Sequence, residues 1–473
     1  MDAPAALMPL AGPPPQTMRD ELRALARLAA PLVGANLLQM AVYAVDVIFV
    51  ARLGAVDFAA ATLGVFLFSL ILWALIGFTG ACAPIIAAEL GARAHAVREV
   101  RRSFRMAMWL GAIASAFFML VLAHGETILH WLGQDPRVAA RTGVFLDILL
   151  FVMLPNVWAG VMRTAAAALG RPGWALVVTL MALGLGILGN WLLVFGHAGF
   201  PALGLEGSAI ASVVTACAMM LAYAAILQFD GKLRRYRLFG RWWRPEWPRL
   251  IEIAKLGAPI ALTFTLEGAL FGGAAFLMGL IGVVEVAAHA IALNIAAIAF
   301  QVPFGIAQAA TIRVGMAYGA ADREWIGRAG WAAIVTGTGF MALTATAIWL
   351  APRLFVSIYV DVSEPAHARE VALAIQYLAV CAMFQLFDGA QAVAAGSLRG
   401  LQDTRMPMLI AGFGYWVAGF GTAIFLGFHA HWEGVGIWVG LAVGLAVVSG
   451  MLVTRWSMRE RLGLLPAHPT KLN

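Results

Sequence analysis

Twelve apolar stretches, each long enough to cross a lipid bilayer as a helix, dominate this chain of 473 residues. A spanning helix needs about 20 mainly apolar residues. Hydrophobic residues make up 62% of the chain and charged residues only 12%, whereas soluble proteins carry about 25% charged residues. The sequence therefore predicts an all-α, polytopic membrane protein. The predicted spans are residues 29–51, 58–83, 104–124, 144–162, 174–196, 204–228, 257–281, 289–312, 330–351, 371–396, 407–428 and 432–454.

The basic residues are distributed unevenly between the two sides of the predicted membrane. All but five of the 32 Lys and Arg residues lie in alternate loops and the two ends of the chain. The five on the other side are Arg52, Arg137, Arg141, Arg353 and Arg369. Cytoplasmic loops are enriched in Lys and Arg, so both termini are predicted to be cytoplasmic. The net charge of +7 then reflects topology, and we expect no nucleic-acid partner.

The second half of the chain repeats the first at an offset of 228 residues. The coinciding pairs are Leu28 and Leu256, Pro31 and Pro259, Gly54 and Gly282, Gly77 and Gly305, and Gly91 and Gly319. Six spans in each half predict two pseudo-symmetric, parallel six-helix lobes, a layout found in transporters. The predicted organisation is a flexible arm (1–27), an N-lobe (28–229), a linker (230–250), a C-lobe (251–458) and a tail (459–473).

Three carboxylates interrupt the apolar spans: Asp46, Glu267 and Asp388. An ionisable group at the centre of a membrane helix costs about 2.5–3.5 kcal/mol, so such groups commonly mark ion or substrate paths. The alternative for each acid is a structural hydrogen bond between helices. Because all three have polar neighbours at helical spacing, we predict that they couple a cation or a proton to transport.

Amide and aromatic side chains near these acids are predicted to line a cavity or contact substrate. Gln39 lies two helical turns before Asp46, and Phe271 lies one turn after Glu267, where it either stacks on substrate or simply packs. The complete predicted set is Asn36, Gln39, Asn190, Phe271, Asn294, Gln301, Gln385 and Gln391.

An intramembrane carboxylate can bind a cation, take up a proton or pair with a cationic substrate. Competition among these ligands can couple an ion gradient to export. The sequence has no HExxH motif, no phosphate-binding loop and no convincing nucleophile–base motif. We therefore predict neither an enzyme nor an ATP-driven pump, and no cofactor. His289, His429 and His431 are predicted to be solvated or interfacial.

Three motifs resemble those of the multidrug and toxic compound extrusion (MATE) transporters. They are "YAVDVIFVARLGAVDFAAATLG" around Asp46, "APIALTFTLEGALF" around Glu267, and "QLFDGAQAVAAGSLRGLQDTRMP" around Asp388. The resemblance extends over residues 20–460. Acids in spans 1, 7 and 10 together resemble the NorM-type bacterial branch, whereas the DinF-like branch typically lacks the second and third.

The resemblance implies a monomeric antiporter of the bacterial inner membrane, in contact with membrane lipids, that exports cationic amphiphilic drugs and dyes by rocking of its lobes. Glu267 and Asp388 would form a C-lobe cation site, with Na⁺ as one candidate ion, and Asp46 would belong to an N-lobe site. Asn190 matches an N-lobe asparagine of the family, and Ser212 occupies a position where relatives use Thr. Val194 stands where some relatives carry Asp, which favours H⁺ over Na⁺ as the coupling ion.

Two other functions remain open at this point. A flippase for lipids or lipid-linked saccharides would need basic groups at mid-span to bind a pyrophosphate, and few are present. A membrane-embedded enzyme would need a nucleophile–base pair or a metal cluster, which the sequence does not display.

Overall fold

The computed structural model describes residues 17–92, 96–131 and 133–466. Across these residues the chain is helical and contains no strand. Twelve helices are long and apolar enough to cross a membrane, and each overlaps one predicted span. The prediction of an all-α, polytopic membrane protein is therefore confirmed.

The chain divides into two compact units. The first contains residues 34–261, and the second contains residues 17–33 together with 262–466. The boundaries therefore fall inside two long helices, α1 (Met18–Val50) and α10 (Trp247–Ile281), and not at the predicted lobe limits. Each of these helices starts in one unit and ends in the other.

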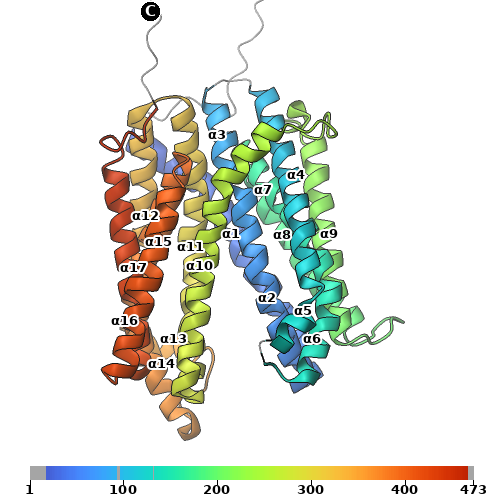
Figure 1. Ribbon diagram of the computed structural model, residues 1–473, viewed down its shortest axis with the longest axis vertical. Coiled ribbons are helices and arrows are strands. Elements are labelled where there is room, and N and C mark those ends of the chain that lie inside the picture. The colour runs from blue at the N-terminus through green and yellow to red at the C-terminus, as the bar shows by residue number, and fades with distance from the viewer. Residues whose placement is uncertain (1–16, 93–95, 132, 467–473) are drawn as a thin grey trace, which may run out of the picture. The chain divides into compact units, whose positions relative to one another are not determined.

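The first unit is built from eight further α-helices and three short 3₁₀ helices. They are η1 (Ala51–Leu53), α2 (Ala55–Gly80), α3 (Cys82–Ala92), α4 (Val97–Leu122), α5 (Gly125–Trp131), α6 (Pro136–Leu149), η2 (Leu150–Val152), α7 (Met153–Ala168), α8 (Gly173–Leu193), α9 (Leu205–Phe229) and η3 (Arg234–Tyr236). Helix α9 packs against α6, α7 and α8, and α2 packs against α4, α6 and α7 (Figure 1). Buried apolar side chains such as Phe68, Leu146 and Met153 form the core between them.

The second unit follows the same order of long helices. Its elements are α11 (Val283–Gly319), α12 (Arg323–Leu350), α13 (Pro352–Val356), η4 (Pro365–His367), α14 (Ala368–Gly400), α15 (Arg405–Gly412), η5 (Phe413–Phe420), α16 (Gly421–Ile424), η6 (Phe425–His429) and α17 (Glu433–Ser457). Helix α14 is central and packs against α11, α12 and α17. Gly396 allows the close approach of α14 to Ala307, because a Cβ there would overlap the α11 backbone.

Two ion pairs show the internal repeat at the level of side chains. In the first unit, Arg141 Nε lies 2.8 Å from Asp57 Oδ1, which is in the first turn of α2. In the second unit, Arg369 Nη2 lies 2.7 Å from Glu285 Oε1, which is in the first turn of α11. Both partners are related by the 228-residue offset read from the sequence. The repeat therefore preserves an ion pair at equivalent positions in the two units.

The predicted flexible arm and the predicted linker both contain folded structure where the structure describes them. Residues 1–16 of the predicted arm lie outside the described residues, but α1 already begins at Met18 because Thr17 Oγ1 accepts a hydrogen bond from the Asp20 N–H and caps the helix. The predicted linker folds onto α4, where Phe239 packs edge-on against Phe104. Residues 467–473 of the predicted tail are likewise outside the described residues.

Candidate cation and substrate sites

The first unit holds Asp46 in a web of neutral hydrogen-bond donors. Asn190 Nδ2, on α8, donates to Asp46 Oδ1 at 2.7 Å. Ser212 Oγ, on α9, donates to Asp46 Oδ2 at 3.3 Å. No basic side chain pairs with Asp46 among the described residues. The three helices therefore orient a carboxylate whose charge stays available to a cation.

Asp46 opens onto a cavity of about 490 Å³ inside the first unit. The cavity is lined by apolar side chains with scattered hydroxyl and amide groups, and Asp46 is its one charged residue among the described lining. Predicted Gln39 lines it, as do Ser69 and Asn156, which sequence reasoning missed because isolated polar residues in a span carry no periodic signal. The volume fits a small amphiphilic molecule.

Two other positions considered in this unit lie away from that lining. Asn36 is buried and does not line the cavity, and its Nδ2 atom has no partner among the described residues. Val194, at the position where the resemblance implies an acid in some relatives, is buried and does not line the cavity. The site in the first unit therefore contains a single carboxylate.

The second unit brings two of the predicted acids together. Glu267 lies on α10 and Asp388 on α14, close enough for their charges to interact. The Gln391 amide is hydrogen-bonded to Glu267. Asp388 is only 4% exposed, and its Oδ1 atom has no hydrogen-bond partner among the described residues. A buried carboxylate oxygen without a partner calls for a bound proton, ion or water.

A cation and an aromatic hydroxyl complete this acid cluster, and neither was predicted. Arg399, on α14, interacts electrostatically with Glu267, and its guanidinium carbon lies 5.5 Å from the centre of the Phe264 ring. Tyr415 lies close to both acids and to Gln391. It belongs to η5, a π-helical stretch, and such distortions occur frequently at functional sites.

The remaining predicted residues of the second unit have packing or local roles. Phe271 packs against Phe384 with ring centroids 6.1 Å apart. Gln385 is fully buried and accepts a hydrogen bond from Thr344 Oγ1 at 2.9 Å. Asn294 and Gln301 donate to carbonyl groups one turn earlier on their own helix. The structure does not bring these side chains into the acid cluster.

His289 differs from the sequence expectation. It is 2% exposed, and its ring lies 5.4 Å from the ring of Trp438, so it is neither solvated nor interfacial. The sequence could not show this because the neighbouring α17 supplies the covering side chain. The described residues contain no group of three or more His, Cys, Asp or Glu that could hold a metal ion.

Comparisons with known proteins agree with these features. The MatE family matches residues 31–192 and 259–425. The chain is 46% identical over 449 residues to the "Probable multidrug resistance protein NorM" of Mesorhizobium japonicum, covering 95% of this chain and 96% of the relative. It is 37% identical over 455 residues to the "Multidrug resistance protein NorM" of Burkholderia vietnamiensis, covering 95% of this chain and 96% of that one.

Solved structures share the fold at low sequence identity. A mutant of the Vibrio cholerae MATE transporter VcmN superposes with a TM-score of 0.85 at 16% identity, covering 94% of this chain and 98% of that one. The eukaryotic MATE transporter AtDTX14 superposes with a TM-score of 0.83 at 19% identity, covering 94% of this chain and 99% of that one.

The family match and the curated relatives identify a membrane transporter and not an enzyme, in keeping with the twelve candidate spans among the described residues. The chain belongs to the MatE family of multidrug efflux transporters, and its curated relatives are named NorM.

Proposed function

We propose that this protein exports cationic, amphiphilic drugs and dyes from the bacterial cytoplasm in exchange for H⁺ or Na⁺. The observation that carries the proposal is the cavity of the first unit, where Asp46 is the one charged residue in an otherwise neutral, mainly apolar lining. Such a lining attracts an organic cation and repels an organic anion. The described lining contains no Lys, Arg or His, which disfavours a flippase for pyrophosphate lipids.

The coupling ion binds at the acid pair of the second unit in this proposal. Glu267 and Asp388 supply negative charge. The Asp388 Oδ1 atom, which has no hydrogen-bond partner in the part of the chain that the structure describes, is the acceptor for a proton or Na⁺. Arg399 competes with the ion for Glu267, so that the site is not left with two uncompensated charges when the ion leaves. Ion and drug then favour opposite states of the transporter, which is the thermodynamic requirement for exchange.

The uneven distribution of Lys and Arg supports a topology with both termini in the cytoplasm. We propose that the transporter acts as a monomer in the inner membrane, alternating between inward-open and outward-open states.

Ethidium uptake into everted membrane vesicles tests this function. A pH gradient is imposed with and without Na⁺. The K⁺/H⁺ exchanger nigericin, in K⁺ medium, is then added to collapse the pH gradient, or a Na⁺-selective ionophore is added to collapse the Na⁺ gradient. We expect uptake that depends on one of the two gradients and stops when that gradient is collapsed. Uptake equal to that of vesicles lacking the protein, or uptake insensitive to both gradients, would contradict the proposal.

A further inference from the structure

The helices that carry Asp46 and Glu267 are divided between the two compact units at equivalent positions. In α1 the boundary lies between Val33 and Gly34, and in α10 between Ala261 and Leu262. These boundaries are separated by the same 228 residues as the sequence repeat. Each helix therefore starts in the unit that does not contain its acid.

A buried ion pair holds the start of α1 in the second unit. Glu21 is completely buried, and both of its carboxylate oxygens accept hydrogen bonds from Arg313, at 2.8 and 2.6 Å. The Trp325 indole N–H also donates to Glu21 Oε2 at 3.1 Å, and the Arg313 guanidinium lies over the Trp325 ring. A bidentate Arg–carboxylate pair of this kind fixes the orientation of the two side chains as well as the distance between them.

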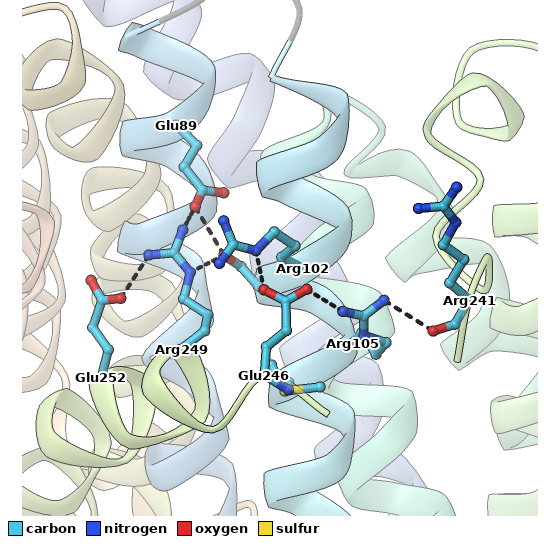
Figure 2. Close-up of polar contacts among 9 residues, drawn as sticks. Glu89, Arg102, Arg105, Arg241, Glu246, Arg249 and Glu252 are labelled. Atoms are coloured by element: carbon cyan, nitrogen blue, oxygen red, sulfur yellow. Dashed lines mark hydrogen bonds and ion pairs between the residues drawn. The ribbon is translucent and has the colours of Figure 1, made fainter. Parts of the chain in front are cut away.

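A second ion pair holds the start of α10 in the first unit. Figure 2 shows Arg249 lying between Glu89 and Glu252, with which it forms ion pairs. Arg249 Nε also donates to Ser103 Oγ at 2.9 Å, and Ser103 in turn donates to Glu89 Oε1 at 3.0 Å. The Arg249 and Glu89 side chains are only 17% and 12% exposed.

The residue just before α10 strengthens this second attachment. Glu246 lies between Arg102 and Arg105 of α4 and pairs with both (Figure 2). The Arg105 side chain is 3% exposed, so its charge depends on this partner. The first unit therefore holds the start of α10 through two adjacent ion-paired groups.

The two attachments occupy equivalent places with opposite charge. Glu21 and Arg249 are related by the repeat offset of 228 residues. Their partners Glu89 and Arg313 both lie near the end of equivalent helical segments, in α3 and α11. The two halves of the chain thus form an ion pair at equivalent positions, with the acidic and basic residues exchanged.

We propose that Glu21 and Arg249 are positioning residues of the transport cycle, an inference that rests on the proposed function. Each holds the start of a site-bearing helix in one unit, so that movement of the units is transmitted along α1 to Asp46 and along α10 to Glu267. The pairs stay closed throughout the cycle, because opening either one would leave a buried charge without its partner. Pro31 and Pro259 lie between each attachment and its acid, where a helix bends more easily.

Purified transporter in proteoliposomes tests the proposal with ethidium as the probe. Glu21→Gln, Arg313→Gln and Arg249→Gln are compared with Glu324→Gln as the matched control. Glu324 also forms an ion pair, with Arg328, but its side chain is 86% exposed. We expect each of the three attachment variants to lower the maximal transport rate at least about tenfold while ethidium affinity changes less than about twofold. Arg249→Lys and the exchanged pair Glu21→Arg with Arg313→Glu should recover much of the rate.

Three outcomes overturn the proposal while wild-type transport is intact: attachment variants as fast as the control, a loss that neither recovery variant restores, or loss of ethidium binding in step with transport. Absence of ethidium transport by the wild-type protein would instead refute the proposed function.

A cross-link provides a gain-of-function measurement. Glu21→Cys and Arg313→Cys are combined in a chain whose native Cys82, Cys217 and Cys381 are replaced. This variant should transport slowly, and a short bis-maleimide bridge between the two cysteines should restore the rate because the attachment stays closed during transport. A bridged protein that remains slow, or becomes slower, would show that the attachment has to open.

Discussion

The acid sites of the two units differ although their scaffolds repeat. In the first unit Asp46 is a single carboxylate, held by two neutral donors and open to a cavity of about 490 Å³. In the second unit Glu267 interacts with Asp388 and with Arg399, and Tyr415 lies close to both acids. The first arrangement provides room for a molecule, and the second provides charge for a small ion.

This difference shows how a duplicated chain can divide two tasks. An antiporter must bind an ion and a cargo at sites that influence each other. Gln39 and Glu267 occupy equivalent positions in the repeat, so one lobe has an amide where the other has a carboxylate. The four predictions below test how the two units differ, in their sites and in their ion pairs.

Removing both acids of the second unit should have the largest effect. Glu267→Gln combined with Asp388→Asn should reduce ion-driven ethidium transport roughly a hundredfold, because each lost charged contact is worth about 1.5–3 kcal/mol. Transport rates under imposed H⁺ and Na⁺ gradients measure the effect. Ethidium affinity in the first unit should be nearly unchanged. A loss of affinity as large as the loss of transport would show that the acids of the second unit also bind ethidium, which contradicts separate sites for ion and cargo.

Neutralising the first unit should affect cargo and not ion dependence. Asp46→Asn should weaken ethidium binding about tenfold, since one charged contact is lost and the amide keeps the side chain's shape. Fluorescence titration gives the affinity, and the gradient response of the remaining transport gives the coupling. If Asp46→Asn abolished the gradient response and left binding intact, the roles of the units would be reversed.

The repeated ion pairs should differ in their contribution to stability. Arg369→Gln leaves Glu285, whose side chain is 5% exposed, without its partner, and should cost about 1–3 kcal/mol of unfolding free energy. Arg141→Gln should cost less than about 1 kcal/mol because Asp57 is 23% exposed. Unfolding in mixed micelles compares the variants. An equal loss for both would show that burial of the acid does not decide the cost.

The linker that follows α9 should make the smallest contribution to stability, present at neutral pH and lost in acid. Burial opposes ionisation of Asp230, but hydrogen bonds from the Lys232 N–H, the Trp174 indole and the Leu233 N–H outweigh it, helped by Arg171, and the pKa of Asp230 lies below its usual value. A depressed folded pKa stabilises the protein above the unfolded value, and this contribution disappears as the pH falls through the folded pKa.

Asp230→Asn should therefore remove less than about 1 kcal/mol of unfolding free energy at neutral pH, and this difference should disappear as the pH falls below the depressed pKa of Asp230. Unfolding curves of both proteins across this range provide the measurement. A difference in unfolding free energy between the two proteins that grows as the pH falls would contradict a lowered pKa for Asp230.

The sequence predicted the spans, the repeat and the three acids because each leaves a local signal. Charges are rare in apolar runs, so Asp46, Glu267 and Asp388 stand out individually. Arg399 was not predicted as a site residue because it follows the predicted end of its span, at residue 396, and was assigned to the basic residues of a cytoplasmic loop. Tyr415 was not predicted because the residues around it carry no sequence signal for a π-helical turn.

The attachments of α1 and α10 were missed for a different reason. Glu21 lay in the predicted arm and Arg249 in the predicted linker, where charged residues are usually solvated. Their partners Arg313 and Glu89 are far away in the sequence, so that burial depends on tertiary packing alone. The division of a helix between two compact units is likewise a property of the whole fold.

The crossing of α1 and α10 between units has a consequence for the origin of the protein. A half-length ancestor with a single set of six spans would have had no second lobe of its own in which to place the beginning of its opening helix. Two copies could have completed each other by exchanging that segment, as in a domain-swapped dimer. Gene fusion would then have made the exchange permanent, with Glu21 and Arg249 as the remnants of a contact between separate subunits.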